Sequence, residues 1–273
     1  MGKRIITTSA LTAGLTLGLC VAAVAQSPTP APPPPTPTPQ PAPPLTKAER
    51  IADRAISLLV SWKLKAAENL LTANEQELGQ TPEYRTALGY LRATTGKWDQ
   101  ATELLRGAAT AKPADPTAQY FLGETMSWRQ KPADADAAWK AARSTALALI
   151  AAGPVNARTH YCLGAARVRL KEYNLARTAL ELARAGGFEP ALVDYQLGLS
   201  YTLEERWQDA IAWFDKVIAK DAKFAHAYFY RGLAYGKLNQ KDRLLVDLDL
   251  FIKLAPNAPE AGIAKATLAA AQR

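Results

Sequence analysis

Apolar residues recur at helical spacing from residue 46 to the end of the chain, and short polar breaks interrupt them at intervals. Three such breaks are Thr95-Gly96-Lys97, Lys131-Pro132 and Asn239-Gln240-Lys241. No stretch alternates apolar and polar residues as a half-buried strand would. The pattern therefore predicts an all-helical domain built from pairs of antiparallel helices, a first helix A and a second helix B.

The helical pairs repeat with a period of 34 residues. The units are 48–81, 82–115, 116–156, 157–190, 191–224 and 225–258, and places within a unit are counted here from its first residue. The third unit is seven residues too long, which is almost two helical turns. We therefore expect an elongated helix over 135–150, ended by Gly153-Pro154.

Small and large residues alternate at fixed places of the units. Place 8 is Gly in five of them: Gly89, Gly123, Gly164, Gly198 and Gly232. Place 24 of the same units is large: Leu105, Trp139, Leu180, Phe214 and Leu248. A Gly inside a helix costs about 1 kcal/mol relative to Ala, so its recurrence predicts close approach of helices A and B at place 8.

These residues resemble the tetratricopeptide repeat (TPR) family. Its unit expects Leu-Gly at places 7–8, Tyr at 11, Ala at 20 and Pro at 32. The matching residues are Leu88-Gly89, Leu122-Gly123, Leu163-Gly164, Leu197-Gly198, Tyr201, Tyr235, Pro113, Pro154 and Pro256. The first unit departs, with Arg54-Ala55 in place of Leu-Gly, and the last has Arg231 and Leu244 at places 7 and 20. Terminal repeats are often atypical.

The resemblance implies an all-α, right-handed superhelical solenoid over 46–273, with about six TPR helix pairs and a solvating helix at 259–273. It also implies that the A helices line a concave groove for a protein partner. The residues that the family's groove places assign to it are Tyr120, Glu124, Trp128, Arg158, Tyr161, Arg169, Tyr195, Leu199, Phe229 and Lys237. The rings at place 5 would form a ladder, although Tyr is also common there for packing.

One known ligand class of the family is not supported. Members that bind a C-terminal carboxylate carry a Lys, Asn and Arg clamp. Place 6, which contributes to that clamp, holds other residues here: Ala87, Phe121, Cys162, Gln196 and Tyr230.

The N-terminus predicts export. Residues 1–25 read as a signal peptide: Lys3 and Arg4 precede an apolar run that ends at Ala23-Val24-Ala25. An uncleaved membrane anchor is the alternative. Residues 26–45 read as an extended linker, since eleven of the nineteen residues in 26–44 are Pro. The expected location is the bacterial periplasm or the exterior, without membrane insertion after cleavage.

Charge and reactive residues exclude several functions. Without Lys3 and Arg4 the chain has 31 basic and 25 acidic side chains, a net +6, and no Lys/Arg run of the kind that binds nucleic acid. After removal of residues 1–25, Cys162 is the only cysteine, so we expect no intramolecular disulfide. His160 and His226 lie in different repeats, and no metal spacing, phosphate loop or nucleophile elbow occurs. We expect no enzyme activity, cofactor or metal.

Three functions stay open at this point. The first is a scaffold or adaptor that binds a partner segment in its groove. The second is binding of peptidoglycan or another carbohydrate on the aromatic ladder. The third is self-assembly into a homo-oligomer through the apolar tip of the long helix, 146–150.

Overall fold

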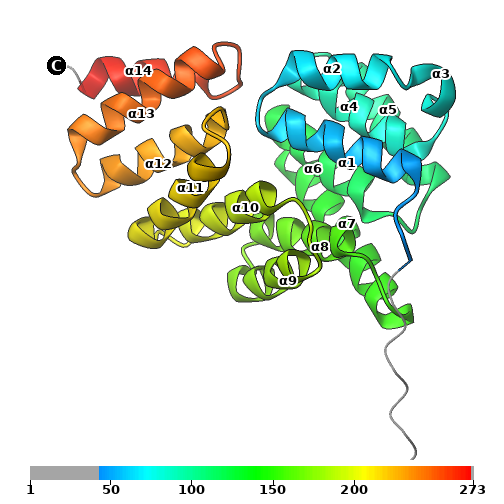
Figure 1. The fold of residues 1–273 in the computed structure, drawn as a ribbon. Coiled ribbons are helices and arrows are strands. Elements are labelled where there is room, and N and C mark those ends of the chain that lie inside the picture. The colour runs from blue at the N-terminus through cyan, green and yellow to red at the C-terminus, as the bar shows by residue number, and fades with distance from the viewer. Residues whose placement is uncertain (1–42, 272–273) are drawn as a thin grey trace, which may run out of the picture. The chain divides into compact units, whose positions relative to one another are not determined.

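The computed structural model describes residues 43–271, so the expected signal peptide (1–25) and nearly all of the linker (26–45) lie outside the described residues. Its helices follow one another with short connections and are shown in Figure 1. They are α1 (Lys47–Val60), α2 (Leu64–Thr72), α3 (Glu75–Leu78), α4 (Pro82–Thr94), α5 (Trp98–Ala111), α6 (Pro116–Trp128), α7 (Pro132–Ala152), α8 (Ala157–Arg169), α9 (Tyr173–Ala185), α10 (Pro190–Leu203), α11 (Trp207–Lys220), α12 (Ala225–Lys237), α13 (Lys241–Leu254) and α14 (Ala261–Ala271).

Twelve of the described helices form six pairs, and α3 and α14 lie outside these pairs. In each pair the A helix packs on the B helix that follows it, and each A helix also contacts the A helix of the next repeat. The A helices are α1, α4, α6, α8, α10 and α12, and they are the elements that face the interior of the array (Figure 1). The all-helical solenoid predicted from the sequence is therefore confirmed.

Capping residues begin the helices where the sequence places them. Thr46 and Glu49 form a capping box: the Thr46 amide donates to the Glu49 carboxylate at 2.9 Å, and the Glu49 amide donates to the Thr46 hydroxyl at 3.2 Å. The Asp115 carboxylate accepts from the Thr117 amide at 2.9 Å and precedes Pro116, the first residue of α6.

The glycines at place 8 explain how tightly A and B pack. A Cβ added at Gly123 would lie 2.3 Å from the Trp139 indole, and one added at Gly198 would lie 2.6 Å from the Phe214 ring. Both neighbours occupy place 24. The predicted approach of the two helices at these places is therefore present.

The turn between A and B repeats its backbone conformation in every unit. The residue at place 15 has a positive φ in all six repeats: Trp62, Gly96, Gln130, Lys171, Glu205 and Asn239. Gly and Asn tolerate this left-handed conformation, whereas a bulky side chain is rarely found in it. Trp62, with φ of 64°, is the outlier of the series.

The long third unit forms the longest helix of the described residues. Helix α7 has 21 residues and ends at Gly153. At its tip Ala146 and Ile150 pack against Leu163 of α8 and Ala179 of α9, while Leu147 is 40% exposed. The next repeat thus covers Ala146 and part of Ile150, while Leu147 and Ala148 stay exposed. Homo-oligomer formation stays a prediction.

Among residues 43–271, none of the helices combines the length and the apolar character needed to cross a bilayer.

Candidate functional site

Most of the residues predicted to line a groove on the A helices are covered by the protein itself. Seven of the ten are at most 6% exposed: Tyr120, Glu124, Arg158, Tyr161, Tyr195, Leu199 and Phe229. Trp128 and Arg169 are partly buried, and Lys237 is exposed. The ladder rings at place 5 therefore present no open face on which a polysaccharide could stack.

Two contacts join the first repeat to repeats at the other end of the array. Trp62, which follows α1, lies against His226 of α12 with ring centroids 5.2 Å apart, and only 8% of it is exposed. The neighbouring Lys63 ammonium lies 2.5 Å from the Asp221 carboxylate, which precedes α12. Trp62 thus contacts the sixth repeat and Lys63 contacts the fifth, and we call these two the closing contacts.

A second set of charges joins the first repeat to the fourth. The buried Arg158 guanidinium lies 3.0 Å from Asp53 of α1 and 3.1 Å from Asp115. Lys112 lies 2.6 Å from Glu83 and 3.0 Å from Glu49. Arg158, which the sequence assigned to a partner, thus holds helix α1 in place.

Burial changes the acid–base behaviour of two groups in this region. Desolvation raises the pKa of Asp53 to about 6, because burial and the nearby carboxylates of Asp115 and Glu49 together outweigh the attraction of Arg158. Desolvation also raises the pKa of the Cys162 thiol to about 12. The thiol therefore stays protonated and is a packing group rather than a nucleophile.

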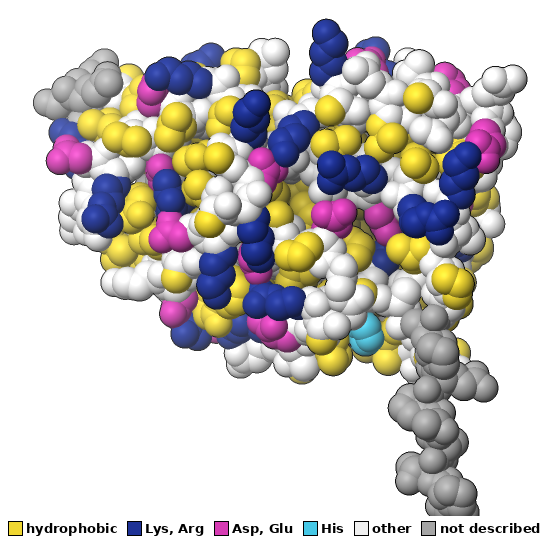
Figure 2. Space-filling view, viewed as in Figure 1, with side chains coloured by type: hydrophobic (Ala, Val, Ile, Leu, Met, Phe, Trp, Pro, Cys, Tyr) yellow, Lys and Arg dark blue, Asp and Glu magenta, His cyan; other side chains and the backbone are white. Residues whose placement is uncertain are grey.

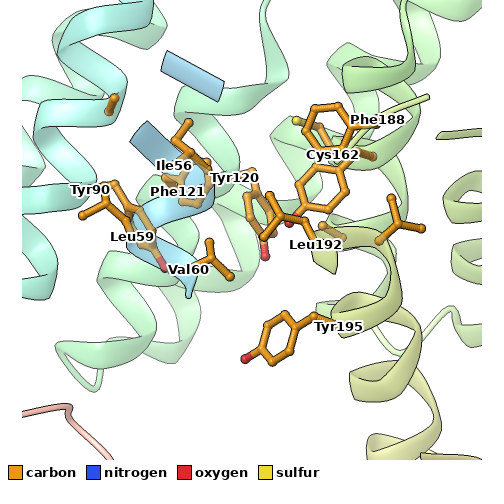
Figure 3. Close-up of a cluster of buried hydrophobic side chains, with 14 of the residues drawn as sticks. Ile56, Leu59, Val60, Tyr90, Tyr120, Phe121, Cys162, Phe188, Leu192 and Tyr195 are labelled. Atoms are coloured by element: carbon orange, nitrogen blue, oxygen red, sulfur yellow. The ribbon is translucent and has the colours of Figure 1, made fainter. Parts of the chain in front are cut away.

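The inner face holds a partly open cavity of about 180 Å³. Every A helix contributes to its wall. The lining residues are Val60, Tyr90, Tyr120, Phe121, Glu124, Ser127, Trp128, Arg169, Tyr195, Gln196, His226, Tyr230 and Glu260. Figure 3 shows Tyr90, Tyr120 and Tyr195 reaching from three helices toward one space near Val60.

An ion pair crosses the cavity wall between α6 and α8. Arg169 donates to both oxygens of Glu124, from Nε at 2.8 Å and from a terminal nitrogen at 2.6 Å. The Trp139 indole donates to the same carboxylate at 3.1 Å. This bidentate geometry is the strongest arrangement of an Arg–carboxylate ion pair, and it fixes the positions of both side chains.

A second acidic group lies at the opposite side of the wall. The Glu260 carboxylate lies 3.2 Å from Nε2 of His226. Burial alone would raise the pKa of Glu260, but the hydrogen bond and charge of His226 outweigh it, and the pKa lies below its ordinary value. Glu260 is therefore an anion at neutral pH.

The ten predicted groove residues leave out several residues of the cavity, among them Tyr90, Gln196, Tyr230 and Glu260. Tyr90 occupies place 9 of the second repeat. This is one of the family's groove places, but groove residues were assigned only from the third repeat onward. Gln196 and Tyr230 occupy place 6. In the sequence, this place was used only to show that the carboxylate-binding clamp is missing. Glu260 lies 34 residues after His226, so one more period would have found it.

No group of three His, Cys, Asp or Glu side chains arranged to hold a metal occurs in residues 43–271. On the face shown in Figure 2, Lys and Arg side chains are spread among Asp and Glu. That face presents no single basic patch.

The sequence matches no protein-family model and no curated protein. Among solved structures, it is similar to a chain of the APC/C hetero-tetramer Cut9-Hcn1 at 18% identity and a TM-score of 0.52, over 80% of this chain and 41% of that one. It thus spans less than half of that chain. YrrB, a TPR protein with an unusual peptide-binding site, is 22% identical over 71% of this chain and 97% of that chain, with a TM-score of 0.42.

A thermophilic TPR protein of Thermus thermophilus, TTC0263, is 19% identical over 68% of this chain and 98% of that chain, with a TM-score of 0.48. At these sequence identities, structural similarity indicates a shared fold and nothing about function. The six helix pairs, the contacts between places 8 and 24 and the structural likeness together show that the chain folds as a tetratricopeptide repeat solenoid.

Proposed function

We propose that the chain is a non-catalytic scaffold of the bacterial cell envelope that binds a partner protein on the outer face of its repeats. The observation that carries this proposal is the covered inner face: seven of the ten groove residues are at most 6% exposed, so a partner segment has no open groove to enter. The partner must then use a surface formed by B helices, or the closing contacts must open first.

The outer face offers one hollow with the composition of a protein interface. It lies between α9 and α11, and its lining includes Arg177, Leu182, Tyr201 and Trp213. Leu182 is 50% exposed, and the Arg177 guanidinium lies 4.6 Å from the centroid of the Tyr201 ring. Trp, Tyr and Arg are the residues that most often dominate binding energy at interfaces.

We call this site the α9–α11 hollow. The occupant that suits it is a segment of a partner protein with an apolar side chain that packs between Leu182 and Trp213. Next to Trp213, the Arg184 guanidinium lies 4.7 Å from the ring centroid and would contact the rim of such a segment.

A matched pair of surface variants tests the hollow. Leu182→Glu places a charge in it, and Val246→Glu places the same charge at another exposed apolar position, on α13, where the native side chain is 59% exposed. We expect cross-linked partner to be lost from the first variant and kept by the second. Equal capture by both would refute the hollow as the binding site.

The concave groove is the second candidate, because its side chains are rich in the aromatic residues that anchor partners. It requires the first repeat to move away from the sixth. Trp62→Gly should then increase partner capture, whereas binding at the α9–α11 hollow should be unchanged by it.

Export rests on residues 1–25. We propose a signal peptide cleaved after Ala25, with the domain held in the periplasm or released. Mass spectrometry of the protein from the envelope fraction should find a chain that begins at Gln26. A mature chain that retains Met1 and sediments with membranes would favour the N-terminal anchor instead.

A further inference from the structure

The walls of the central cavity are mostly aromatic. Tyr90 stacks on Trp128 with centroids 5.7 Å apart and contacts Phe121 at 4.3 Å, while Tyr195 and Tyr230 meet edge to face at 6.1 Å on the other side. Aromatic side chains that surround a small space attract cations to the negative faces of their rings. The cavity therefore has the wall chemistry of a cation cage.

The charges in the wall are not balanced. The charged or titratable side chains apart from the tyrosines are Glu124, Arg169, His226 and Glu260. Glu124 and Arg169 neutralise each other through their two hydrogen bonds. When the His226 ring is uncharged, Glu260 leaves one net negative charge in the cavity wall. A bound cation would neutralise it.

One buried polar group also lacks a partner. Gln196 is 2% exposed and donates from Nε2 to the Tyr120 hydroxyl at 3.1 Å, but its Oε1 atom accepts no hydrogen bond among the described residues. Exchanging the two ends of the amide would leave the amino group unpartnered instead. A buried polar atom without a partner is costly, and the partial negative charge of this oxygen adds to the preference of the wall for a cation.

The size of the cavity limits the ligand. A cavity of about 150 Å³ in another protein accommodates benzene, which has six non-hydrogen atoms. The 180 Å³ here suits a molecule of roughly seven such atoms. A peptide does not fit.

We infer that the cavity binds a small organic ammonium ion, with the cation held between the Tyr90, Trp128 and Tyr230 rings and its charge matched by Glu260. The lining runs from Val60 of the first repeat to His226 of the sixth. Such a ligand touches the elements that the closing contacts join, so its binding stabilises the closed array. This inference does not depend on where a partner protein binds.

Calorimetry and thermal unfolding of the mature chain at pH 8 test the proposal. The probes are choline and ethanolamine, and 3,3-dimethylbutan-1-ol is the uncharged control, because it has the shape of choline without the charge. We expect one choline or ethanolamine per chain and a rise in the unfolding temperature, with at least about tenfold weaker binding of the uncharged alcohol.

Three variants locate the binding. Glu260→Gln and Trp128→Leu should each weaken choline binding about tenfold, while Glu68→Gln, an exposed position with the same change in charge, should leave it unchanged. Circular dichroism confirms that each variant is folded, and Trp128→Leu provides an independent reading if Glu260→Gln is not.

The inference is overturned if neither cation gives saturable heat up to tens of millimolar. It is equally overturned if the uncharged alcohol binds as tightly as choline, or if folded Trp128→Leu and Glu260→Gln bind choline as the native chain does. Binding of either cation that requires Trp128 and Glu260 would establish it.

Discussion

Replacing Trp62 by Gly should open the contact between the first and sixth repeats. The native side chain is 8% exposed and packs on His226, in a backbone conformation with φ of 64° that disfavours bulky residues. Burial of roughly 200 Å² of Trp surface at about 25 cal/mol per Å² stabilises the fold by about 5 kcal/mol. Relief of the backbone strain by Gly returns about 1 kcal/mol of this.

The expected net loss in the free energy of unfolding is therefore about 4 kcal/mol, measured by urea denaturation. Small-angle X-ray scattering of the folded Trp62→Gly variant should show a larger radius of gyration than that of the native chain, because the first and last repeats separate without unfolding. Lys171→Gly is the control: it has the same place and a similar φ of 62°, but its exposed side chain carries no such contact. We expect it to change the free energy of unfolding by no more than about 1 kcal/mol. If both variants behaved alike in both measurements, the reasoning on Trp62 would be refuted.

Three further predictions concern packing and titration. Gly198→Ala should destabilise the fold by about 2–3 kcal/mol, since its Cβ would lie 2.6 Å from Phe214, whereas Gly107→Ala, with nothing within 4 Å, should stabilise it by about 1 kcal/mol; chemical denaturation measures both. Because the folded pKa of Asp53 is raised to about 6, its contribution to stability is fully present below pH 3.8 and is lost as the pH rises through 6. Relative to Asp53→Asn, the native chain should thus lose about 2 kcal/mol between pH 4 and pH 7.5, and a constant difference would contradict the raised pKa. With a pKa raised to about 12 and no exposure to solvent, Cys162 should react with a thiol reagent only after unfolding, and fast labelling of the folded chain would contradict this assignment.

The local features of the fold could be predicted from the sequence because they depend on one repeat at a time. Gly at place 8 and a large residue at place 24 lie within one helix pair, so their contact follows from the period. The length of α7 follows in the same way from the seven additional residues. The family's groove places located the inner side chains, including Tyr120 and Glu124, but not their exposure.

Closure could not be predicted in this way. Lys63 and Asp221 meet across 158 residues, and their distance depends on small rotations that accumulate over four successive repeat interfaces. The spacing of residues within one repeat does not determine the total rotation over several repeats. The only local indication was Trp62 itself, a bulky residue at a turn position where the second repeat has Gly96.

The closing contacts also change how the domain should come apart. In an open stack of repeats each unit contacts only its neighbours, so the two ends fray first and independently. Here Trp62 and His226 join those ends, so neither terminal repeat can loosen without the other. Hydrogen exchange in α1 should therefore accelerate when α12–α14 are removed, even though more than a hundred residues separate them in the chain.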